Sequence, residues 1–465
     1  MFRSTRSYRS WAVGCIIITV SLLLLTHIVL LQKSSSTSRT TSWQTWLRRP
    51  RAWTHSRDHP QHPSISINDS EKFLTFLPHS GLHNQRIALI NAGILAGALN
   101  RTLLMPELNL GTATFWRPSN QLTERLAHCP GSLHEPDSHC YDYRDYVPVP
   151  VDQIFDLTPL HELGIRTMQR HDMNDDYFLR YWGIDETNED KKMMYTLKDN
   201  VRYSYQIHDE MSVPNATLEQ FQSRIDLHYL ATRQEPFLMF GSLFGSRRLA
   251  LTRTDLINIR EYLRQKIGIK HPMVLNKAND IMDQLGGANN YLSVHLRQGD
   301  GRFKKEAKKT IGQIRGALER YANKYGQEEE NHNNNNEEQA LIVKELRSMT
   351  DRTKRLKACV YVQEKYRHPN LRLIYMATDT KNPHEKFIDL YDKFVCLFTL
   401  NDFPDVVQSI RDTRVDVDPY LRDGNLLLPL VDGEVAAKAD YFIPTPKSTF
   451  SGYIRQRNTY FHEMI

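Results

Sequence analysis

The sequence predicts an α/β protein with one membrane-spanning segment at its N-terminus. Three observations predict this class. Short apolar runs alternate with longer segments of helical spacing. Each run ends in a loop that carries Gly, Ser, Asp or Pro. A long uncharged apolar stretch precedes all of them. The 465 residues, 40% hydrophobic and 25% charged, suffice for two to three globular units and exclude a collagen-like or wholly disordered chain.

The net charge of +6 is concentrated at the N-terminus. Residues 1–51 hold eight basic side chains and no acid, so removing these eight from +6 leaves about −2 for residues 52–465. The part of the chain expected to fold is therefore nearly neutral. This excludes the basic footprint of a nucleic-acid-binding protein.

The apolar stretch runs from Trp11 to Leu31 without a charged side chain. At 1.5 Å per residue it spans roughly 30 Å, the thickness of a bilayer's hydrocarbon core. A cleaved signal peptide is the alternative, since small residues follow, but its apolar region is usually only about 7–15 residues long. We therefore expect a cytoplasmic tail at 1–10 and a signal anchor at 11–31. Residues 32–70, rich in Ser, Thr, Arg, His and Pro, are expected to be a flexible stem.

Glycosylation sequons place the body in the lumen of the secretory pathway. Three such sequons follow the anchor, at Asn68, Asn100 and Asn215. The expected protein is thus a single-pass type II membrane protein of the Golgi or the endoplasmic reticulum.

The cysteines agree with an oxidising compartment. Four of the five follow the anchor, and we expect the pairs Cys129–Cys140 and Cys359–Cys396, which close short loops. Four buried free thiols are the alternative. The sequence has no CxxC and no His-rich zinc spacing, so no metal site is predicted.

Five apolar runs are predicted to be buried strands, and one segment of helical period, Gln85–Leu99, to be a helix. The strands are Phe73–Leu77, Pro236–Phe240, Tyr291–Leu296, Leu371–Ala377 and Ala439–Ile443. We expect two units, 71–288 and 289–465, and a polar loop inserted at about 327–338. Ligands of parallel α/β sheets bind where strands end in loops, so these loops are the candidate sites.

Two loops have the chemistry of a phosphate site. In Pro78–Arg86, Gly81 allows a tight turn and the following helix start offers N–H groups, with Asn84 and Gln85 as further donors. An ordinary capped turn is the alternative. In the second loop His295 and Arg297 share one side of a strand, and an Arg fork fits a diphosphate. Here a buried Arg297–Asp300 ion pair is the alternative.

Two further strand ends complete the candidate set. Asp379 can accept hydrogen bonds from a base or a sugar hydroxyl, or cap the next helix. Ser448 and Thr449 can form a second phosphate cradle, or a plain helix cap, and Phe450 can pack on a ring. Together the four loops predict a nucleoside diphosphate held between two α/β domains.

These segments together resemble the GDP-fucose protein O-fucosyltransferase family, in the family's order, over roughly residues 73–458. The segments that carry the resemblance are Ser80-Gly-Leu-His-Asn-Gln85, Leu99-Asn-Arg-Thr-Leu103 with Pro106, His295-Leu-Arg297 with Gly299-Asp300, Ala377-Thr-Asp379, and Ser448-Thr-Phe-Ser-Gly-Tyr-Ile-Arg455.

The resemblance implies a GT-B fold, in which two Rossmann-like domains face each other across a cleft. It implies metal-independent, inverting transfer of L-fucose from GDP-β-L-fucose to an acceptor hydroxyl, expected on Ser or Thr of a protein, with no cofactor. By resemblance Arg297 stabilises the leaving GDP. The implied donor-binding residues are Gly81, Leu82, His83, Asn84, His295, Arg297, Asp379, Ser448, Thr449 and Phe450.

Two features depart from the family pattern. Gln298 stands where many relatives carry a second Arg, and the N-terminal anchor differs from soluble luminal members. Glu107 is a weak candidate for the general base, with a surface position as its alternative.

Other functions remain open at the level of sequence. Asp416-Val-Asp418 matches the metal motif of GT-A enzymes but lacks a flanking apolar strand. The same fold with another nucleotide sugar or a glycan acceptor is a second alternative. A non-catalytic, membrane-anchored binding protein or chaperone is the third.

Overall fold

The structure is a computed structural model that describes residues 71–111, 115–129, 140, 146–170, 172–174, 176–184, 193–210, 218–299, 301–327, 336–366, 368–412 and 424–465. All of them belong to one unit, Arg57–Ile465. The expected tail, anchor and stem lie outside the described residues, as do Asn68, Asn215, Asp300 and Asp416–Asp418. Within the described part of the chain, no helix has the length and apolar character needed to cross a bilayer.

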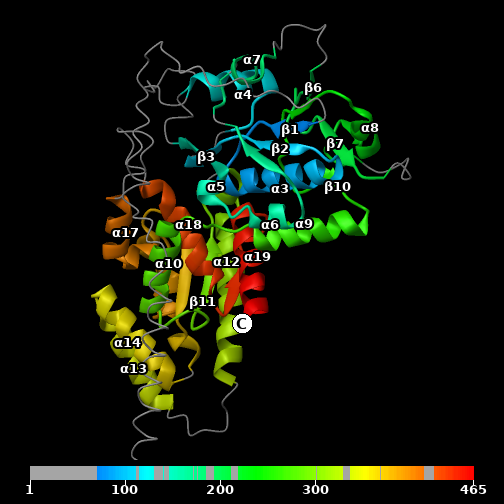
Figure 1. Cartoon of the computed structure of the whole chain (residues 1–465). Helices are drawn as coiled ribbons and strands as arrows, with labels where there is room; N and C mark the ends of the chain where they lie inside the picture. Colours follow the sequence, from blue (N-terminus) through cyan, green and yellow to red (C-terminus); the bar gives the residue numbers. More distant parts are fainter. Residues whose placement is uncertain are drawn as a thin grey trace, which may run out of the picture. The chain divides into compact units, whose positions relative to one another are not determined.

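Two parallel sheets organise the described residues (Figure 1). The first has the strand order β5 (Thr167–Gln169), β2 (Thr102–Met105), β1 (Phe73–Phe76), β9 (Phe237–Phe240) and β6 (Met194–Leu197). The second has the order β13 (Leu397–Phe398), β12 (Ile374–Thr378), β11 (Leu292–Leu296) and β14 (Tyr441–Ile443). Sheets of this kind, connected by helices, define an α/β protein.

Two smaller sheets accompany the first. One is parallel, with the order β10 (Leu249–Ala250), β7 (Tyr205–His208) and β8 (Ser223–Asp226). The other is the antiparallel pair of β3 (Leu108–Gly111) and β4 (Tyr146–Val149).

The helices of the first half lie between residues 82 and 284. They are α3 (Leu82–Ala98), α4 (Ser119–His128), α5 (Val151–Ile154), α6 (Thr158–Glu162), α7 (Tyr177–Trp182), α8 (Leu227–Thr232), α9 (Thr254–Lys266) and α10 (Pro272–Gln284).

The helices that follow β11 complete the chain. They are α11 (Gly301–Lys305), α12 (Ala307–Gln327), α13 (Asn336–Ser348), α14 (Arg352–Lys365), α15 (Pro383–Lys386), α16 (Ile388–Lys393), α17 (Pro404–Arg411), α18 (Gly424–Ala437) and α19 (Thr449–Met464), with 3-10 turns η2 (Pro369–Leu371) and η3 (Leu400–Asp402).

The central strands of both large sheets are covered on both faces, which is why they are mostly apolar. Along β1, Leu74 and Phe76 pack with α3 in the main core, whereas Phe73 joins a second core on the opposite face. Along the second sheet, Tyr375 faces the main core and Met376 a third core beneath α12. The main core continues from the first sheet into the second, so the two halves share buried apolar surface.

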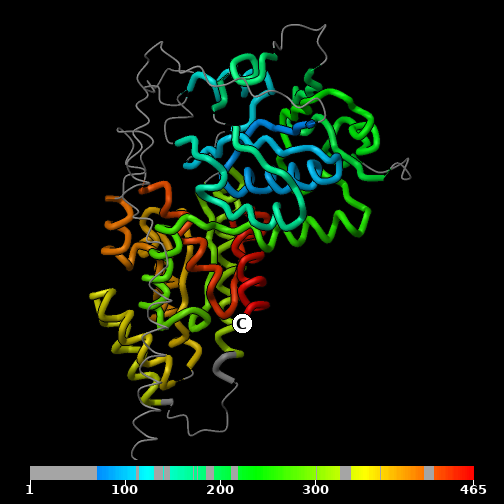
Figure 2. The backbone as a smooth tube through the Cα atoms, viewed as in Figure 1, coloured from blue at the N-terminus to red at the C-terminus, as the bar shows by residue number. Residues whose placement is uncertain are grey.

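The last helix connects the halves. α19 contacts α18 and β14 of the second half, and also α3 and α9 of the first (Figure 2). Arg86 of α3 is fully buried at this junction. Its guanidinium donates to the carbonyl of Ile267 at 2.7 Å and to that of Arg264, and so caps the C-terminal end of α9. The same guanidinium donates to Gln456 of α19 at 3.2 Å and lies 5.0 Å from the centre of the Tyr453 ring.

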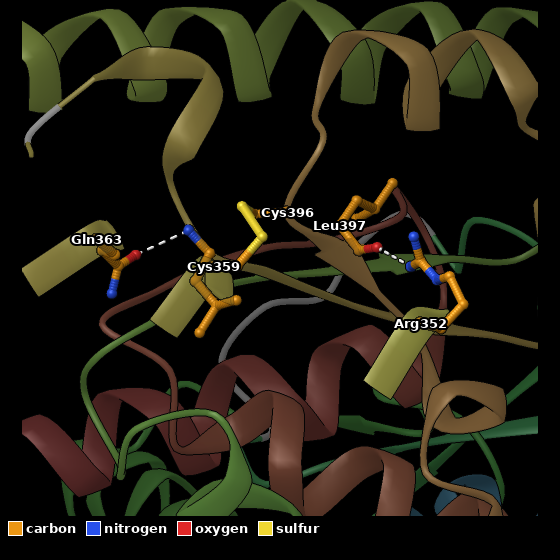
Figure 3. Close-up of a disulfide and its surroundings, with 6 residues drawn as sticks. Arg352, Cys359, Gln363, Cys396 and Leu397 are labelled. Atoms are coloured by element: carbon orange, nitrogen blue, oxygen red, sulfur yellow. Dashed lines mark hydrogen bonds between the residues drawn. A yellow bond between two sulfur atoms is a disulfide. The ribbon is translucent and has the colours of Figure 1, made fainter. Parts of the chain in front are cut away.

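The expected disulfides are present. Cys129 is bonded to Cys140, and Cys359 of α14 to Cys396, which precedes the edge strand β13. Figure 3 shows the second bridge, with Arg352 on the same helix donating to the carbonyl of Leu397. The bridge and this hydrogen bond both attach α14 to the edge of the sheet.

The predicted secondary structure is confirmed for all five strands and for the first helix, with ends that differ by at most three residues. The C-terminal boundary predicted for the polar loop, at about residue 338, is wrong. α13 already begins at Asn336, and Glu337 and Glu338 lie in its first turn, where acidic side chains favour a helix start. Asn100 is exposed in the turn after α3, and its glycosylation stays a prediction.

Candidate active site

The first candidate loop joins β1 to the start of α3. Gly81 occupies the N-cap position, and no side chain of the described residues caps the helix there. A Cβ added at Gly81 would meet no atom within 4 Å, so the start of the helix faces open space. Uncapped N–H groups and the helix dipole make such a start suitable for an anion.

The left-handed residue of this loop is Ser80, not the glycine. Ser80 has φ 69°, whereas Gly81 has φ −66° and ψ 161°, which any residue can adopt. The tight turn expected at Gly81 is therefore made one residue earlier. Gly81 instead leaves room beside the helix start.

Gln85 shapes the loop. Its amide nitrogen donates to the carbonyls of Ser80 and Asn109, each at 3.0 Å, and its amide oxygen accepts the N–H of Asn109 at 2.9 Å. The two bonds to Asn109 hold Gln85 to β3 and the bond to Ser80 holds it to the loop, so Gln85 stabilises the loop. The neighbouring Asn84 is half-buried, and its side-chain oxygen has no hydrogen-bond partner among the described residues.

His83 connects the first loop to the second half of the chain. Its ring stacks on Tyr453 with centroids 4.4 Å apart and lies 4.9 Å from the ring of Phe450. Burial lowers the pKa of His83 well below its usual value, and the positive charges of Arg86 and Arg297 act in the same direction. The imidazole is therefore neutral, and its Nδ1 has no hydrogen-bond partner within the described residues. Leu82 beside it is buried.

His295 lies at the end of β11, buried, with its Nδ1 2.7 Å from the hydroxyl of Ser451. Burial, with Arg297, lowers its pKa to about 3, so the ring is neutral. Ser451 already accepts the N–H of Thr445 at 3.0 Å, which leaves its own proton for Nδ1. This network favours the tautomer of His295 with its proton on Nε2, a donor suited to a phosphate oxygen.

Arg297 follows two residues later and is half-buried. Its backbone N–H donates to the hydroxyl of Thr445 at 3.1 Å, and its guanidinium lies 4.7 Å from the centre of the Phe303 ring. Because its charge acts on the pKa values of both His83 and His295, the loops after β1 and β11 meet at one place.

Asp379, after β12, positions the same loop. Its carboxylate oxygens accept the backbone N–H groups of Gln298 at 2.8 Å and Gly299 at 2.9 Å. A Cβ at Gly299 would lie 2.7 Å from one of these oxygens, so the close approach requires glycine. The exposed carboxylate therefore holds the chain that follows Arg297, and the contact with guanine or ribose stays a prediction.

The fourth loop begins α19. The hydroxyl of Ser448 accepts the N–H of Ser451 at 3.3 Å, which is a helix cap. Thr449 is the first residue of the helix and is half-buried. The ring of Phe450 lies 4.9 Å from His83 and 4.8 Å from His295, so it packs between the two histidines.

The candidate residues thus gather at one junction. His83, His295 and Phe450 are in ring contact, with Arg297 near both histidines. Missed by the sequence reasoning were Thr445 and Ser451, although Ser451 lies within the motif quoted for the resemblance. Glu107 is buried, which excludes the surface position considered for it.

A pocket of about 330 Å³ lies beside this junction, between α12 and the chain leading into α19. Its lining consists of Gly312, Gln313, Ile314, Gly316, Ala317, Arg320, Ile443, Pro444 and Pro446. In the part of the chain that is described, no three His, Cys, Asp or Glu side chains are grouped as a metal site.

Comparison with known proteins identifies the family of this chain. The sequence profile described as GDP-fucose protein O-fucosyltransferase matches residues 73–461. The chain therefore belongs to the GDP-fucose protein O-fucosyltransferase family. It is a glycosyltransferase and, within that class, a fucosyltransferase.

Solved structures are similar at low identity. A crystal structure of POFUT1 in complex with GDP has 11% identity and a TM-score of 0.39, covering 85% of this chain and 97% of its own. The fucosyltransferase NodZ from Bradyrhizobium has 12% identity and a TM-score of 0.35, covering 83% and 93%. Among curated proteins, none matches this chain.

Proposed function

We propose that this protein transfers L-fucose from GDP-β-L-fucose to a hydroxyl of Ser or Thr in a protein acceptor, by an inverting, metal-independent reaction. We further propose that it is a type II protein of the Golgi membrane, anchored by residues 11–31 with its body in the lumen. Family membership supports the sugar and the donor. The two disulfides and the uncharged Trp11–Leu31 segment support the compartment.

One observation carries the proposal for the site. The uncapped start of α3 and the end of β11 meet through the contacts of Phe450 with His83 and His295. One loop thus supplies backbone N–H groups, and the other supplies Nε2–H of His295 and the guanidinium of Arg297. Donors from two sides suit a diphosphate.

The proposed reaction is a displacement at the anomeric carbon. The acceptor hydroxyl oxygen attacks that carbon from the face opposite the phosphate, the bond from the carbon to the phosphate oxygen breaks, and the hydroxyl proton passes to water. An α-linked product and GDP result. Negative charge grows on the departing phosphate, and Arg297 opposes it, a stabilisation that is largest in the transition state.

The first experiment measures donor binding by calorimetry on the full chain in detergent, with and without EDTA. We expect binding of GDP and GDP-fucose in preference to UDP and UDP-sugars, unchanged by the chelator. Preference for UDP-sugars would favour another donor. Binding of GDP without transfer to any acceptor would favour a non-catalytic protein, and loss of activity in EDTA would contradict metal independence.

Arg297→Ala tests the site itself. We expect nearly unchanged thermal unfolding, because Arg297 is half-buried, and a loss of about 3 kcal/mol in transition-state stabilisation, measured as kcat/KM.

Arg302→Ala is the matched control. Arg302 also lies over the Phe303 ring, at 5.5 Å, but is exposed, so its loss should leave kcat/KM within about twofold. Unfolding of the Arg297 variant, or equal losses in both variants, would contradict the role of Arg297.

A further inference from the structure

The serine before Gly81 has an unusual conformation. Ser80 is in the left-handed region at φ 69°, where glycine is favoured, although a glycine stands at the next position without using it. Strained residues of this kind are found most often at functional sites, where the side chain has a role in binding or catalysis.

Three side chains connected by hydrogen bonds indicate the role of Ser80. His79, 3% exposed, has its Nδ1 2.9 Å from the hydroxyl of Ser80 and its Nε2 2.6 Å from the hydroxyl of Ser242. Ser242 is fully buried at the end of β9. The three side chains therefore form a line from the interior to the loop at the start of α3.

The hydrogen-bond partners of Ser242 indicate which groups donate and which accept along the series Ser242, His79 and Ser80. The hydroxyl of Ser242 accepts the N–H of Phe244 at 3.1 Å, and its own proton has His79 Nε2 as its acceptor among the described residues. Nε2 is then the accepting nitrogen, so Nδ1 carries the ring proton and donates it to Ser80. Burial, together with Arg248 and Arg202, keeps His79 neutral, as this assignment requires.

Ser80 is thereby left with a proton of its own to donate. Its oxygen receives the hydrogen bond of His79, which polarises the O–H group and strengthens it as a donor. Ser80 is half-buried, and the space beside it at Gly81 is open. In the same turn, His83 Nδ1 and Asn84 Oδ1 are buried polar atoms without partners among the described residues, which points to a ligand at this turn.

We propose that the Ser80 hydroxyl donates a hydrogen bond to the diphosphate of the bound nucleotide sugar, and that His79 and Ser242 are positioning residues that aim it. This inference rests on the proposed function. A buried histidine usually has only a packing role. Here one ring nitrogen of His79 accepts from Ser242 and the other donates to Ser80. Because His79 is neutral with both nitrogens occupied, it acts in orientation and not as a base.

The test compares Ser80→Gly and Ser80→Ala by calorimetry with GDP on the full chain. Glycine removes the hydroxyl and relieves the left-handed strain, while alanine removes the hydroxyl and keeps the strain. Both should weaken GDP binding about tenfold, the effect of one lost hydrogen bond to an anion. The melting temperature of Ser80→Gly should equal or exceed that of the wild type.

Asn289→Gly is the matched control, because Asn289 has φ 68° and is exposed at the opposite end of β11. This substitution should relieve the same left-handed backbone strain and leave GDP binding unchanged. Ser242→Ala should weaken GDP binding severalfold although Ser80 is intact, since His79 is then no longer held in one tautomer.

The outcomes separate the two proposals. Wild-type chain that binds no GDP overturns the proposed function. Wild-type chain that binds GDP while Ser80→Gly binds it within about twofold as tightly overturns the role of Ser80 alone. Weakening in Ser80→Ala but not in Ser80→Gly assigns the effect to the backbone, which also overturns it. Unchanged binding in Ser242→Ala overturns the aiming by His79.

Discussion

Asp432 of α18 is a carboxyl group held in the interior. It accepts the hydroxyl of Tyr375 at 2.6 Å and the N–H of Thr378 at 3.2 Å, and burial raises its pKa to about 7. In the unfolded chain the same group loses its proton near pH 3.9. Between these values the folded state binds the extra proton, so this group makes the free energy of unfolding decrease as pH rises.

Asp432→Asn, with a neutral amide, should remove that contribution. The free energy of unfolding of the wild type, measured in urea, should decrease through this group by up to about 1.4 kcal/mol for each pH unit between pH 4 and 7. The free energy of unfolding of the variant should not show this decrease. Asp405→Asn, at an exposed position of α17, is the surface control. The same pH dependence in wild type and Asp432→Asn would show that Asp432 is ionised in the folded protein.

At this scale the sequence predicted which residues gather, and less often what each one does. His295 and Arg297 were placed at a strand end by the period of the strand alone. The engagement of Asp379 with Gln298 and Gly299 depends on the pairing of β11 with β12, which no local pattern contains. The direction of a hydroxyl proton, as in Ser451, depends on neighbours distant in sequence.

Helix packing sets the position of Phe450. A Cβ added at Gly433 of α18 would lie 3.0 and 3.1 Å from two ring carbons of Phe450 on α19. The ring would have to move by a few tenths of an ångström, and it contacts both His83 and His295. Glycine in α18 therefore allows the close approach on which the candidate site depends.

Gly433→Ala should lower fucose transfer severalfold by displacing the ring, measured as kcat/KM. Gly452→Ala is the control, because a Cβ there meets no atom within 4 Å. In helix α19 alanine should stabilise the protein by about 0.5–1 kcal/mol and leave transfer unchanged. Equal activity of both variants would mean that the ring position is not critical.

Central strands were easier to predict than edge elements. Strands buried on both faces, such as β1 and β11, are buried at every position and mostly apolar, so they stand out in the sequence. β6 has half-buried and exposed residues, and β13 has two residues, so neither has a recognisable pattern. The start of α13 follows a run of asparagines, a composition typical of loops, and its two glutamates alone did not indicate a helix.

For the whole molecule, buried histidines contribute to the response to acid, and among the described residues the pKa is lowered most at His79, His83 and His295. The pKa values of His79 and His295 are lowered to about 3, and that of His83 is lowered well below its usual value, with burial as the main cause. Unfolded histidine takes up a proton below about pH 6.5, whereas these three remain neutral in the folded protein. Folding therefore loses stability as pH falls below 6.5.

The raised pKa values of Asp432 and Asp199 act in the opposite direction, and the three histidines outnumber them. We expect the midpoint of urea unfolding to decrease steadily from pH 6.5 to pH 4.5. His79→Asn, His83→Asn and His295→Asn should each reduce the slope, and exposed His228→Asn should not. A midpoint that is constant over this range would show that the histidines are protonated in the folded state.

The contacts of α19 also bear on how the chain is made. The first sheet emerges from the ribosome early, and domains generally fold as units, N-terminal ones first. Here the ring of His83 finds its partner in Tyr453, Arg86 in Gln456 and a carbonyl of α9 in Arg457, more than 350 residues after β1 begins. A nascent chain halted before residue 453 lacks these partners, and its exposed apolar surface is of the kind that chaperones bind. The candidate site is therefore completed only after the last helix has been synthesised.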